Sequence, residues 1–415
     1  MQSSDSSAIL VTGVGITSAI GHGAADFTAA LLEGRSNFAV MKRPGRQCAT
    51  GDEPSTTQFI GAEIPSYSPP EGLPASILRT ASLSGQVALA SLHEAWRDAK
   101  LQDVDPVRIG LVVGGSNVQQ RELTRAHESY RERPQFLRPT YGLSFMDSDI
   151  SGMCSEVFGI RGFAYTLGGA SASGQLAAIQ AVQAVASGQV DVCIAVGALM
   201  DLSHWECQGL RSLGAMGSDE FADRPQLACR PFDRRTDGFI FGESCGVVVV
   251  ERAGSATRAG VNPYARVAGW AVRMDANRNP NPSFEGEVSV IRQALQSAGF
   301  APQSIDYVNP HGTGSRLGDA TELKTIEEVG LKHAFLNTTK SLIGHGLSAA
   351  GASELVATVL QMRAGQLHPC GNLDQPIDDS CNWVRGRAME HRIRRAVKIS
   401  LGFSGINCAM CLESS

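Results

Sequence analysis

Residues 168–186 read GGASASGQLAAIQAVQAVA, a turn of small residues that runs directly into an apolar helix. A turn of this kind can present a nucleophile, and Ser171 and Ser173 are the candidates. The esterase elbow G-x-S-x-G is not matched, because Ser173 stands where its second glycine would be. The role of Ser171 therefore has to be decided from the rest of the chain.

The helix after Ser171 has a counterpart late in the sequence. Residues 173–191, SGQLAAIQAVQAVASGQVD, and residues 349–369, AAGASELVATVLQMRAGQLHP, are both small-residue helices that end in Gly-Gln. A second pair, residues 89–115 and 288–312, shares the order helix, polar turn, strand and glycine-containing loop. Two matching pairs in the same order predict two similar halves, which we place at residues 1–258 and 259–415.

Apolar runs alternate with helical patterns along the chain, which predicts an α/β fold with covered sheets. The expected strands lie at residues 8–16, 109–115, 190–199, 245–251, 305–310 and 396–403. The expected helices include residues 82–99, 174–187, 287–298 and 350–364. Two long loops, at residues 34–75 and 117–150, are expected to cap a pocket or form an interface.

Composition narrows the class of protein. The 415 residues are 43% hydrophobic, enough for a sizeable core, and the net charge of −5 does not indicate a general nucleic-acid binder. The first residues lack the basic segment of a signal peptide and no apolar run reaches about 18 residues, so we expect a cytoplasmic protein with no membrane partner. Cys408 and Cys411 form a CxxC inside an expected strand, where they would face opposite sides, which favours a core role over metal or redox chemistry.

Two histidines lie in glycine-rich turns. His311 follows an expected strand in VNPHGTGSRLGDATEL, residues 308–323, and strand ends are where α/β sheets place ligands. His345 lies between two glycines before the second duplicated helix, with Lys340 five positions earlier. In a two-fold arrangement both duplicated helix starts can point at one central site, where free N–H groups can stabilise an oxyanion. The alternative is that His311 has a structural role, that His345 belongs to a helix cap, and that Lys340 is an ordinary surface lysine.

Together the motifs resemble the β-ketoacyl synthase family of the thiolase superfamily, and the likeness covers essentially the whole chain. The segments that carry it are ILVTGVGITSAIG (9–21), RPFDRRTDGFIFGE (230–243), PHGTGSRLGD (310–319), KSLIGHGLSAAGASE (340–354) and GFSGIN (402–407). The resemblance implies a thiolase-like fold of two pseudo-duplicated α/β halves in layers, and a homodimer. It also implies no permanently bound cofactor or metal, and acyl thioesters carried on the phosphopantetheine of an acyl carrier protein.

The same resemblance implies catalytic roles for matching residues. His311, in His-Gly-Thr-Gly, corresponds to the first catalytic histidine of the family, and His345, in Gly-His-Gly, corresponds to the second. Lys340 and Glu322 correspond to a supporting ion pair.

Further matching residues are expected to bind the substrate. Thr313 and Ser315 correspond to the residues that hydrogen-bond pantetheine, although threonine is common at the second position. Phe403 corresponds to a gatekeeper whose N–H forms the oxyanion hole together with the N–H of Ser171. Ser404 stands where the family usually has a second glycine, so the gate is expected to be less mobile.

The main departure is Ser171 itself, because condensing members of the family carry cysteine there. A cysteine of pKa about 8.5 accepts an acyl group readily, whereas a serine hydroxyl stays protonated and needs a strong base. Without an acyl group on the enzyme, a carbon nucleophile has no electrophile to attack. Two neutral imidazoles can still stabilise the enolate that forms when a malonyl group loses CO₂.

This pattern resembles the ketosynthase-like decarboxylases of polyketide β-branching cassettes. It implies decarboxylation of malonyl-acyl carrier protein to acetyl-acyl carrier protein without condensation. Three alternatives stay open: an elongating synthase whose cysteine has been replaced by serine, a non-catalytic partner like a chain-length factor, and an acyltransferase with Ser171 as a true nucleophile. The codon of the native gene, co-purification with a cysteine-bearing homologue, and a mass shift on Ser171 would identify each in turn.

One basic segment is a candidate docking site for the acidic carrier protein. EHRIRRAVK, residues 390–398, contains Arg392, Arg394, Arg395 and Lys398. The alternative interpretation is the solvated start of a strand.

Overall fold

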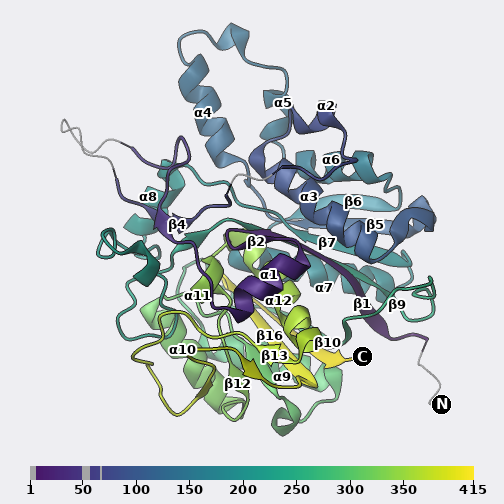
Figure 1. The fold of residues 1–415 in the computed structure, drawn as a ribbon, viewed down its shortest axis with the longest axis vertical. Coiled ribbons are helices and arrows are strands. Elements are labelled where there is room, and N and C mark those ends of the chain that lie inside the picture. Colours follow the sequence, from purple (N-terminus) through teal and green to yellow (C-terminus); the bar gives the residue numbers. More distant parts are fainter. Residues whose placement is uncertain (1–5, 49–56, 66–67) are drawn as a thin grey trace.

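The computed structural model describes residues 6–48, 57–65 and 68–415 (Figure 1). Within these residues the largest element is a mixed sheet of twelve strands, eleven of which follow one another across it and the twelfth of which, β2 (Gly21–His22), pairs with β1. The eleven are, in spatial order, β14 (Asn382–Trp383), β12 (Phe335–Leu336), β11 (Tyr307–Asn309), β16 (Arg395–Gly402), β17 (Ile406–Ser414), β10 (Ala265–Met274), β1 (Ile9–Ser18), β9 (Ser244–Arg252), β7 (Val192–Gly197), β5 (Ile109–Gly114) and β6 (Phe163–Leu167). Smaller sheets join β3 (Ala39–Val40), β4 (Ile60–Ala62) and β8 (Phe241–Gly242), and β13 (Gln366–Leu367) with β15 (Met389–Glu390).

The large sheet repeats one pairing pattern on the two sides of the β1–β10 contact. On one side β1 pairs with β9 and β9 with β7 antiparallel, and β5 then lies parallel to β7 and to β6. On the other side β10, β17, β16, β11 and β12 pair in the same succession of orientations. Residues 253–264 connect the two sets. The fold is therefore the duplicated α/β arrangement expected from the sequence, while the division of the chain at residue 258 stays a prediction.

Helices cover both faces of this sheet in layers. The central pair packs against strands of both sets and consists of α7 (Ser173–Ala186) and α12 (Ala350–Ala364). The outer helices are α3 (Leu83–Asp98) and α6 (Ser148–Phe158) on the N-terminal strands, and α9 (Phe284–Ala298) and α10 (Arg316–Glu328) on the C-terminal strands. Because helices cover both faces, β5, β7 and nearly all of β9 are buried along their length, and these are the apolar runs recognised in the sequence.

The described residues contain six further α-helices. They are α1 (Ala24–Leu32), α2 (Ala75–Leu78), α4 (Gln120–Tyr130), α5 (Tyr141–Ser144), α8 (His204–Ser212) and α11 (Lys340–Ile343). Figure 1 shows α4 and α5 projecting from the top of the molecule, above α3 and α6. No helix of the described residues is long and apolar enough to cross a membrane.

The two central helices approach closely because each has a glycine at the contact. A Cβ atom on Gly174 would lie 2.7 Å from the backbone N of Ala352. A Cβ atom on Gly351 would lie 2.6 Å from the backbone N of Gln175. Any side chain at either position would force one helix away from the other. The two central helices can therefore pack this closely only because both carry small residues at the contact.

Each central helix begins with a short 3₁₀ turn, and the two turns contact each other. The first residues of these turns, Ala170 and Leu347, have φ of 46° and 50°, a left-handed conformation that is uncommon outside glycine. Backbone strain of this kind persists where packing holds it, and it occurs often at functional sites. The matching turns bring Ser171 next to His345, as the predicted two-fold arrangement requires.

Most expected elements are confirmed, and the differences are the following. Strands of the large sheet, including β6 and β10, were missed, although the residues of β10 alternate between buried and partly exposed positions. Residues 117–150 are not a long loop, because they contain α4, α5 and the start of α6. The other expected loop contains β3 and β4, and its residues 49–56 and 66–67 lie outside the described residues.

The CxxC behaves as predicted in the described residues. Cys408 and Cys411 both lie in β17, are fully buried and are free thiols. They face opposite sides of the sheet, because Cys408 belongs to the core around the central helices and Cys411 to the core under α9 and α10. Across the part of the chain that the structure describes, no group of three or more His, Cys, Asp or Glu residues could hold a metal ion.

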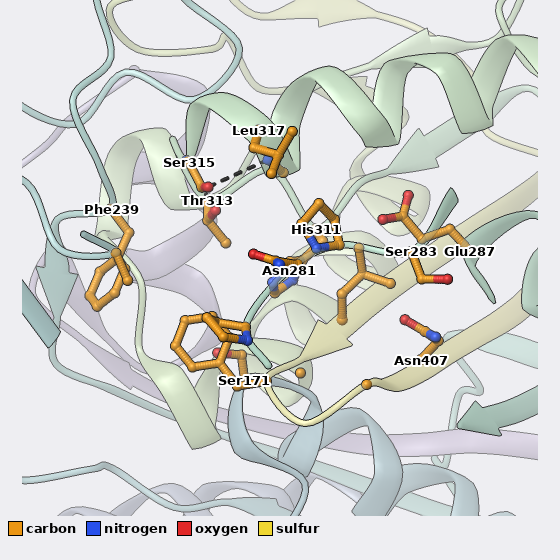
Figure 2. Close-up of a pocket in the computed structure, with 18 of the residues that line it drawn as sticks. Ser171, Phe239, Asn281, Ser283, Glu287, His311, Thr313, Ser315, Leu317 and Asn407 are labelled. Carbon is orange, nitrogen blue, oxygen red and sulfur yellow. Dashed lines mark hydrogen bonds between the residues drawn. The ribbon is translucent and has the colours of Figure 1, made fainter. Parts of the chain in front are cut away.

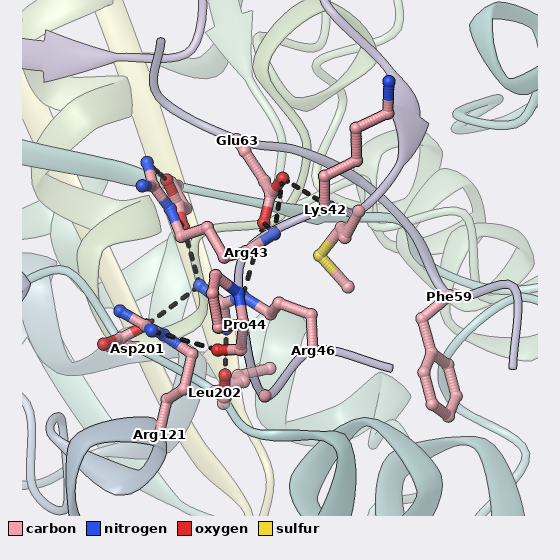
Figure 3. Close-up of polar contacts among 12 residues, drawn as sticks. Lys42, Arg43, Pro44, Arg46, Phe59, Glu63, Arg121, Asp201 and Leu202 are labelled. Atoms are coloured by element: carbon pink, nitrogen blue, oxygen red, sulfur yellow. Dashed lines mark hydrogen bonds and ion pairs between the residues drawn. The ribbon is translucent and has the colours of Figure 1, made fainter. Parts of the chain in front are cut away.

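A buried cluster of charges ties the segment after β3 to the sheet (Figure 3). The Arg46 guanidinium has no exposure and contacts Asp201 Oδ1 at 2.9 Å and Glu243 Oε1 at 2.6 Å. Arg43 binds the same Glu243 carboxylate at 2.8 Å, and Arg121 binds Asp201 at 2.7 Å. Glu243 directly follows β8, and β8 forms a backbone bridge to residue 345. The cluster therefore fixes the strand against which the second histidine lies.

Candidate active site

A cavity of about 240 Å³ lies at the ends of β11 and β16, next to the start of α7 (Figure 2). Its lining includes six residues predicted from the sequence: Ser171, His311, Thr313, Ser315, His345 and Phe403. They come from four separate turns and from both sets of strands. The structure thus places the candidate residues around one space, except for Lys340 and Glu322, which lie behind it.

Ser171 forms a hydrogen bond with His345, the second histidine. Its Oγ lies 2.9 Å from His345 Nε2, and the residue is only 6% exposed. A serine nucleophile needs a base that is itself oriented by a third group. His345 Nδ1 is buried and has no hydrogen-bond partner among the described residues. The geometry therefore supplies half of a serine triad and omits the group that would orient the base.

The two histidines face each other across the cavity. Their ring centroids are 5.7 Å apart and the rings are nearly perpendicular. Burial, followed by the positive charge of Lys340, lowers the pKa of both imidazoles well below 6.5. Both rings are therefore neutral at pH 7, and each can donate one N–H to an oxygen that becomes negative during a reaction.

The ion pair beneath the histidines differs from the prediction. Lys340 pairs with Glu354 of α12 and not with Glu322, and its ammonium also donates to the backbone carbonyl of His311. Lys398 of β16 pairs with the other oxygen of Glu354 at 2.7 Å. Glu322 has a different task, since its Oε1 accepts the backbone N–H of His311 at 2.5 Å. One glutamate thus pairs with two lysines, and the other holds the loop of the first histidine.

The predicted pantetheine residues form a stiff loop at the cavity. Ser315 Oγ accepts from the backbone N of Gly318 at 3.4 Å at the start of α10, and Thr313 Oγ1 accepts from the backbone N of Ser315 at 3.2 Å. The carboxylate of Asp319 accepts from the backbone N of Thr313 at 3.1 Å. Both side chains line the cavity, and their hydrogen bonds to pantetheine stay a prediction.

Phe403 lies in the turn between β16 and β17. Gly405 N donates to Gly402 O at 3.2 Å across this turn, and Ser404 has a φ of 70°. This left-handed conformation costs a residue with a Cβ atom about 1 kcal/mol or more, whereas glycine adopts it without steric cost. Serine also restricts the alternative conformations of the turn, while the less mobile gate stays a prediction. The oxyanion hole formed by the N–H groups of Phe403 and Ser171 stays a prediction.

The basic segment at 390–398 is only partly available for docking. Lys398 is fully buried in its pair with Glu354, so its expected part in docking is wrong. Arg395 pairs with Glu413 at 3.0 Å, while Arg392 and Arg394 are exposed. These arginines lie at the start of β16, and the cavity lies at the end of the same strand. Seven residue steps at about 3.3 Å each separate the two ends by about 23 Å.

The buried pair of Glu354 and Lys398 was not predicted from the sequence, although a signal was present. Glu354 is a lone carboxylate within the small-residue helix, and Lys398 is a lone cation within an apolar strand. Buried charges are paired, so two such residues of opposite sign predict each other. Glu287, which also lines the cavity, is an exception to this rule, because no described residue forms an ion pair with it.

Comparisons with known proteins show the family of the chain. Residues 6–256 match the N-terminal domain of beta-ketoacyl synthases, and residues 264–374 match their C-terminal domain. The chain is 55% identical over 406 residues to the polyketide biosynthesis malonyl-ACP decarboxylase PksF of Bacillus subtilis, covering 98% of this chain and 96% of that protein. It is 29% identical to 3-oxoacyl-[acyl-carrier-protein] synthase 2 of Coxiella burnetii, over 98% of each chain. A beta-ketoacyl synthase from Burkholderia phymatum has the same fold, with a TM-score of 0.86 at 24% identity over 98% of this chain and 99% of that one. This chain belongs to the β-ketoacyl synthase family and has the thiolase-like fold.

Proposed function

We propose that this protein decarboxylates malonyl-acyl carrier protein to acetyl-acyl carrier protein in polyketide biosynthesis, without condensation. The observation that carries the proposal is the combination of an intact, neutral histidine pair with serine in place of the nucleophilic cysteine. The 55% identity to a malonyl-ACP decarboxylase supports the same reaction. The resemblance to decarboxylases of β-branching cassettes points to acetyl-carrier protein as the product delivered.

The histidines supply the electrostatic part of this reaction. The thioester carbonyl of the malonyl group accepts one N–H from His311 and one from His345. The bond between C2 and the carboxylate carbon breaks, CO₂ leaves, and the electron pair forms an enolate whose oxygen lies between the two donors. A proton then adds to C2 and gives the acetyl thioester.

Ser171 leaves the enolate without an acceptor. Its hydroxyl lacks an oriented base, because no described residue holds His345 Nδ1. No acyl group is therefore covalently bound to the enzyme, and carbon–carbon bond formation has no electrophile. The hydroxyl instead keeps the His345 ring in position through the 2.9 Å bond.

The test is intact mass spectrometry of malonyl-loaded carrier protein with and without the enzyme. We expect loss of CO₂ without chain extension, and strong suppression of that loss in His311→Ala and His345→Ala. His127→Ala is the matched control, because His127 is exposed and lies outside the cavity. An unchanged carrier protein, or normal turnover in either pocket variant, contradicts the proposal.

The hydrogen bond between Ser171 and His345 also favours a second candidate, acyl transfer through Ser171. That reaction would leave an acyl group on the serine oxygen after incubation with an acyl thioester. Peptide mass spectrometry of the 168–186 segment would detect it. A stoichiometric adduct that turns over would replace decarboxylation as the assigned reaction.

The proposed assembly is a homodimer served by an acyl carrier protein. β6 lies at one end of the large sheet, its outer edge has no partner strand among the described residues, and Tyr165 on it is 39% exposed. Open strand edges pair readily with a second chain. Large apolar side chains are also exposed nearby in sequence, namely Phe136, Leu143, Phe145 and Met146. Light scattering during gel filtration would test the dimer, and a monomer at micromolar concentration would refute it.

A further inference from the structure

The cavity contains an acid that none of the assigned roles uses. Glu287 lies in the first turn of α9, is 1% exposed, and lines the same cavity as Ser171 and both histidines (Figure 2). Its Oε2 accepts from Thr325 Oγ1 at 3.0 Å. Its Oε1 is buried and has no hydrogen-bond partner among the described residues. A polar atom left in this state is stabilised by a group that enters the cavity.

This carboxyl group carries a proton at neutral pH. Burial and the nearby carboxylates of Glu322 on α10 and Asp275 after β10 raise the pKa of Glu287 to about 9. Asp275 is held by Asn407 of β17, and α9 packs against β10, β17 and α10. The charged groups that face Glu287 are therefore acidic, and they disfavour its ionised form. A protonated carboxyl group is a hydrogen-bond donor and a general acid.

The proposed reaction needs such an acid. After CO₂ leaves, C2 must receive a proton, and both imidazole N–H groups are occupied by the enolate oxygen. The hydroxyl groups of the cavity are weak acids and keep their protons. We propose that Glu287 supplies the proton that converts the enolate into the acetyl group. This inference rests on the decarboxylation proposed above and names the group that completes it.

The proton transfer balances without a further reactant. The O–H bond of Glu287 breaks, a C–H bond forms at C2, and the negative charge moves from the enolate to the carboxylate. Solvent then returns one proton to Glu287 through the open cavity. The net change is malonyl carboxylate and one proton to acetyl and CO₂.

The experiment compares pH profiles of kcat and KM for malonyl-carrier protein between pH 6 and 10. Glu287→Gln keeps the shape of the side chain and its acceptor for Thr325 but carries no acidic proton. Glu287→Asp keeps the acid on a shorter stem. The matched control is Glu285→Gln, because Glu285 lies in the same helical turn, is exposed and does not line the cavity.

We expect kcat of the natural protein to fall about tenfold per pH unit above a pH near 9, and Glu285→Gln to behave identically. Glu287→Gln should lose about 100-fold in kcat at pH 7.5, with KM within twofold, and should show no such fall between pH 8 and 10. Glu287→Asp should recover part of kcat together with the alkaline fall. These readouts separate proton supply from a structural role, which would not alter the pH profile.

Two outcomes would overturn the inference. Glu287→Gln could retain the natural kcat, or it could retain the alkaline fall, which would then belong to another group, such as Lys398 behind the histidines, whose pKa burial lowers. Failure of the proposed function gives a different result, because the natural protein itself would then release no CO₂. Far-ultraviolet circular dichroism and thermal unfolding of each variant confirm that the comparison is made between folded proteins.

Discussion

Replacement of Glu354 by Gln tests the charge arrangement beneath the histidines. The Glu354 carboxylate contacts the ammonium groups of Lys340 and Lys398, and all three side chains are at most 1% exposed. Glutamine keeps the shape but removes the negative charge that the two cations share. Two buried ammonium groups would then lose the carboxylate that they both contact.

The expected loss of stability follows from the distances. Opposite charges 2.7 Å apart attract by about 6 kcal/mol at an effective dielectric constant of about 20, before the cost of dehydration. Removal of one partner from a buried ion pair costs about 3–5 kcal/mol in practice. Since two cations are affected, we expect Glu354→Gln to lose about 5 kcal/mol. That is a large part of the roughly 5–15 kcal/mol by which a typical protein is folded.

The assay is urea unfolding followed by circular dichroism, with the rate of CO₂ release measured on the same samples. Glu327→Gln is the control, because the Lys332–Glu327 pair is 3.3 Å long and the glutamate is 66% exposed. It should cost less than about 1 kcal/mol. The rate should fall in Glu354→Gln because Lys340 also holds the His311 carbonyl. A loss below about 1 kcal/mol with a natural rate would refute the view that this carboxylate is ionised and paired.

Three further variants or conditions have defined outcomes. Ser171→Cys places a thiol beside His345 and should yield an acyl-enzyme with acetyl-carrier protein, detected by intact mass; no adduct would show that the residue at 171 does not decide acylation. Because the pKa values of both histidines lie well below 6.5 and the neutral rings are the active form, CO₂ release should stay level from pH 8 to about 6.5 and fall only at lower pH; a halving by pH 6.5 would contradict this. Gly351→Ala, whose Cβ would lie 2.6 Å from Gln175 N, should lose about 1–3 kcal/mol in urea unfolding, whereas Gly152→Ala, with no atom within 4 Å, should lose none.

The fold was predictable because both faces of its strands are covered. Strands such as β5 and β7 are continuous apolar runs for that reason, and they stand out in a single sequence. β10 has small or polar residues at many positions, so its alternation is weak, and it was missed. The central helices could be paired from their repeated small residues, because close helix packing needs those residues in both copies.

The partners of charged groups could not be predicted in the same way. Glu322 and Glu354 both lie near Lys340, and the sequence gives no distances that would separate them. Tertiary packing decides: the loop of His311 takes the oxygens of Glu322, while the packing of α12 on β16 places Glu354 between two lysines. The protonation of Glu287 depends equally on three-dimensional neighbours, since Asp275 lies twelve residues away and Glu322 thirty-five.

Ser171 and Glu287 together determine what becomes of the enolate, because Ser171 leaves it without an acyl acceptor and Glu287 supplies its proton. A condensing enzyme must keep protons from its enolate until the carbon–carbon bond forms, and an acid in the cavity competes with that step. Ser171→Cys alone should therefore become acylated and still release mainly acetyl-carrier protein. The double variant Ser171→Cys/Glu287→Gln should divert a larger share of the enolate into the extended acetoacetyl product, measured by mass spectrometry of the carrier protein. Equal shares in the single and double variants would mean that Glu287 does not supply the proton and that the enolate takes it from water.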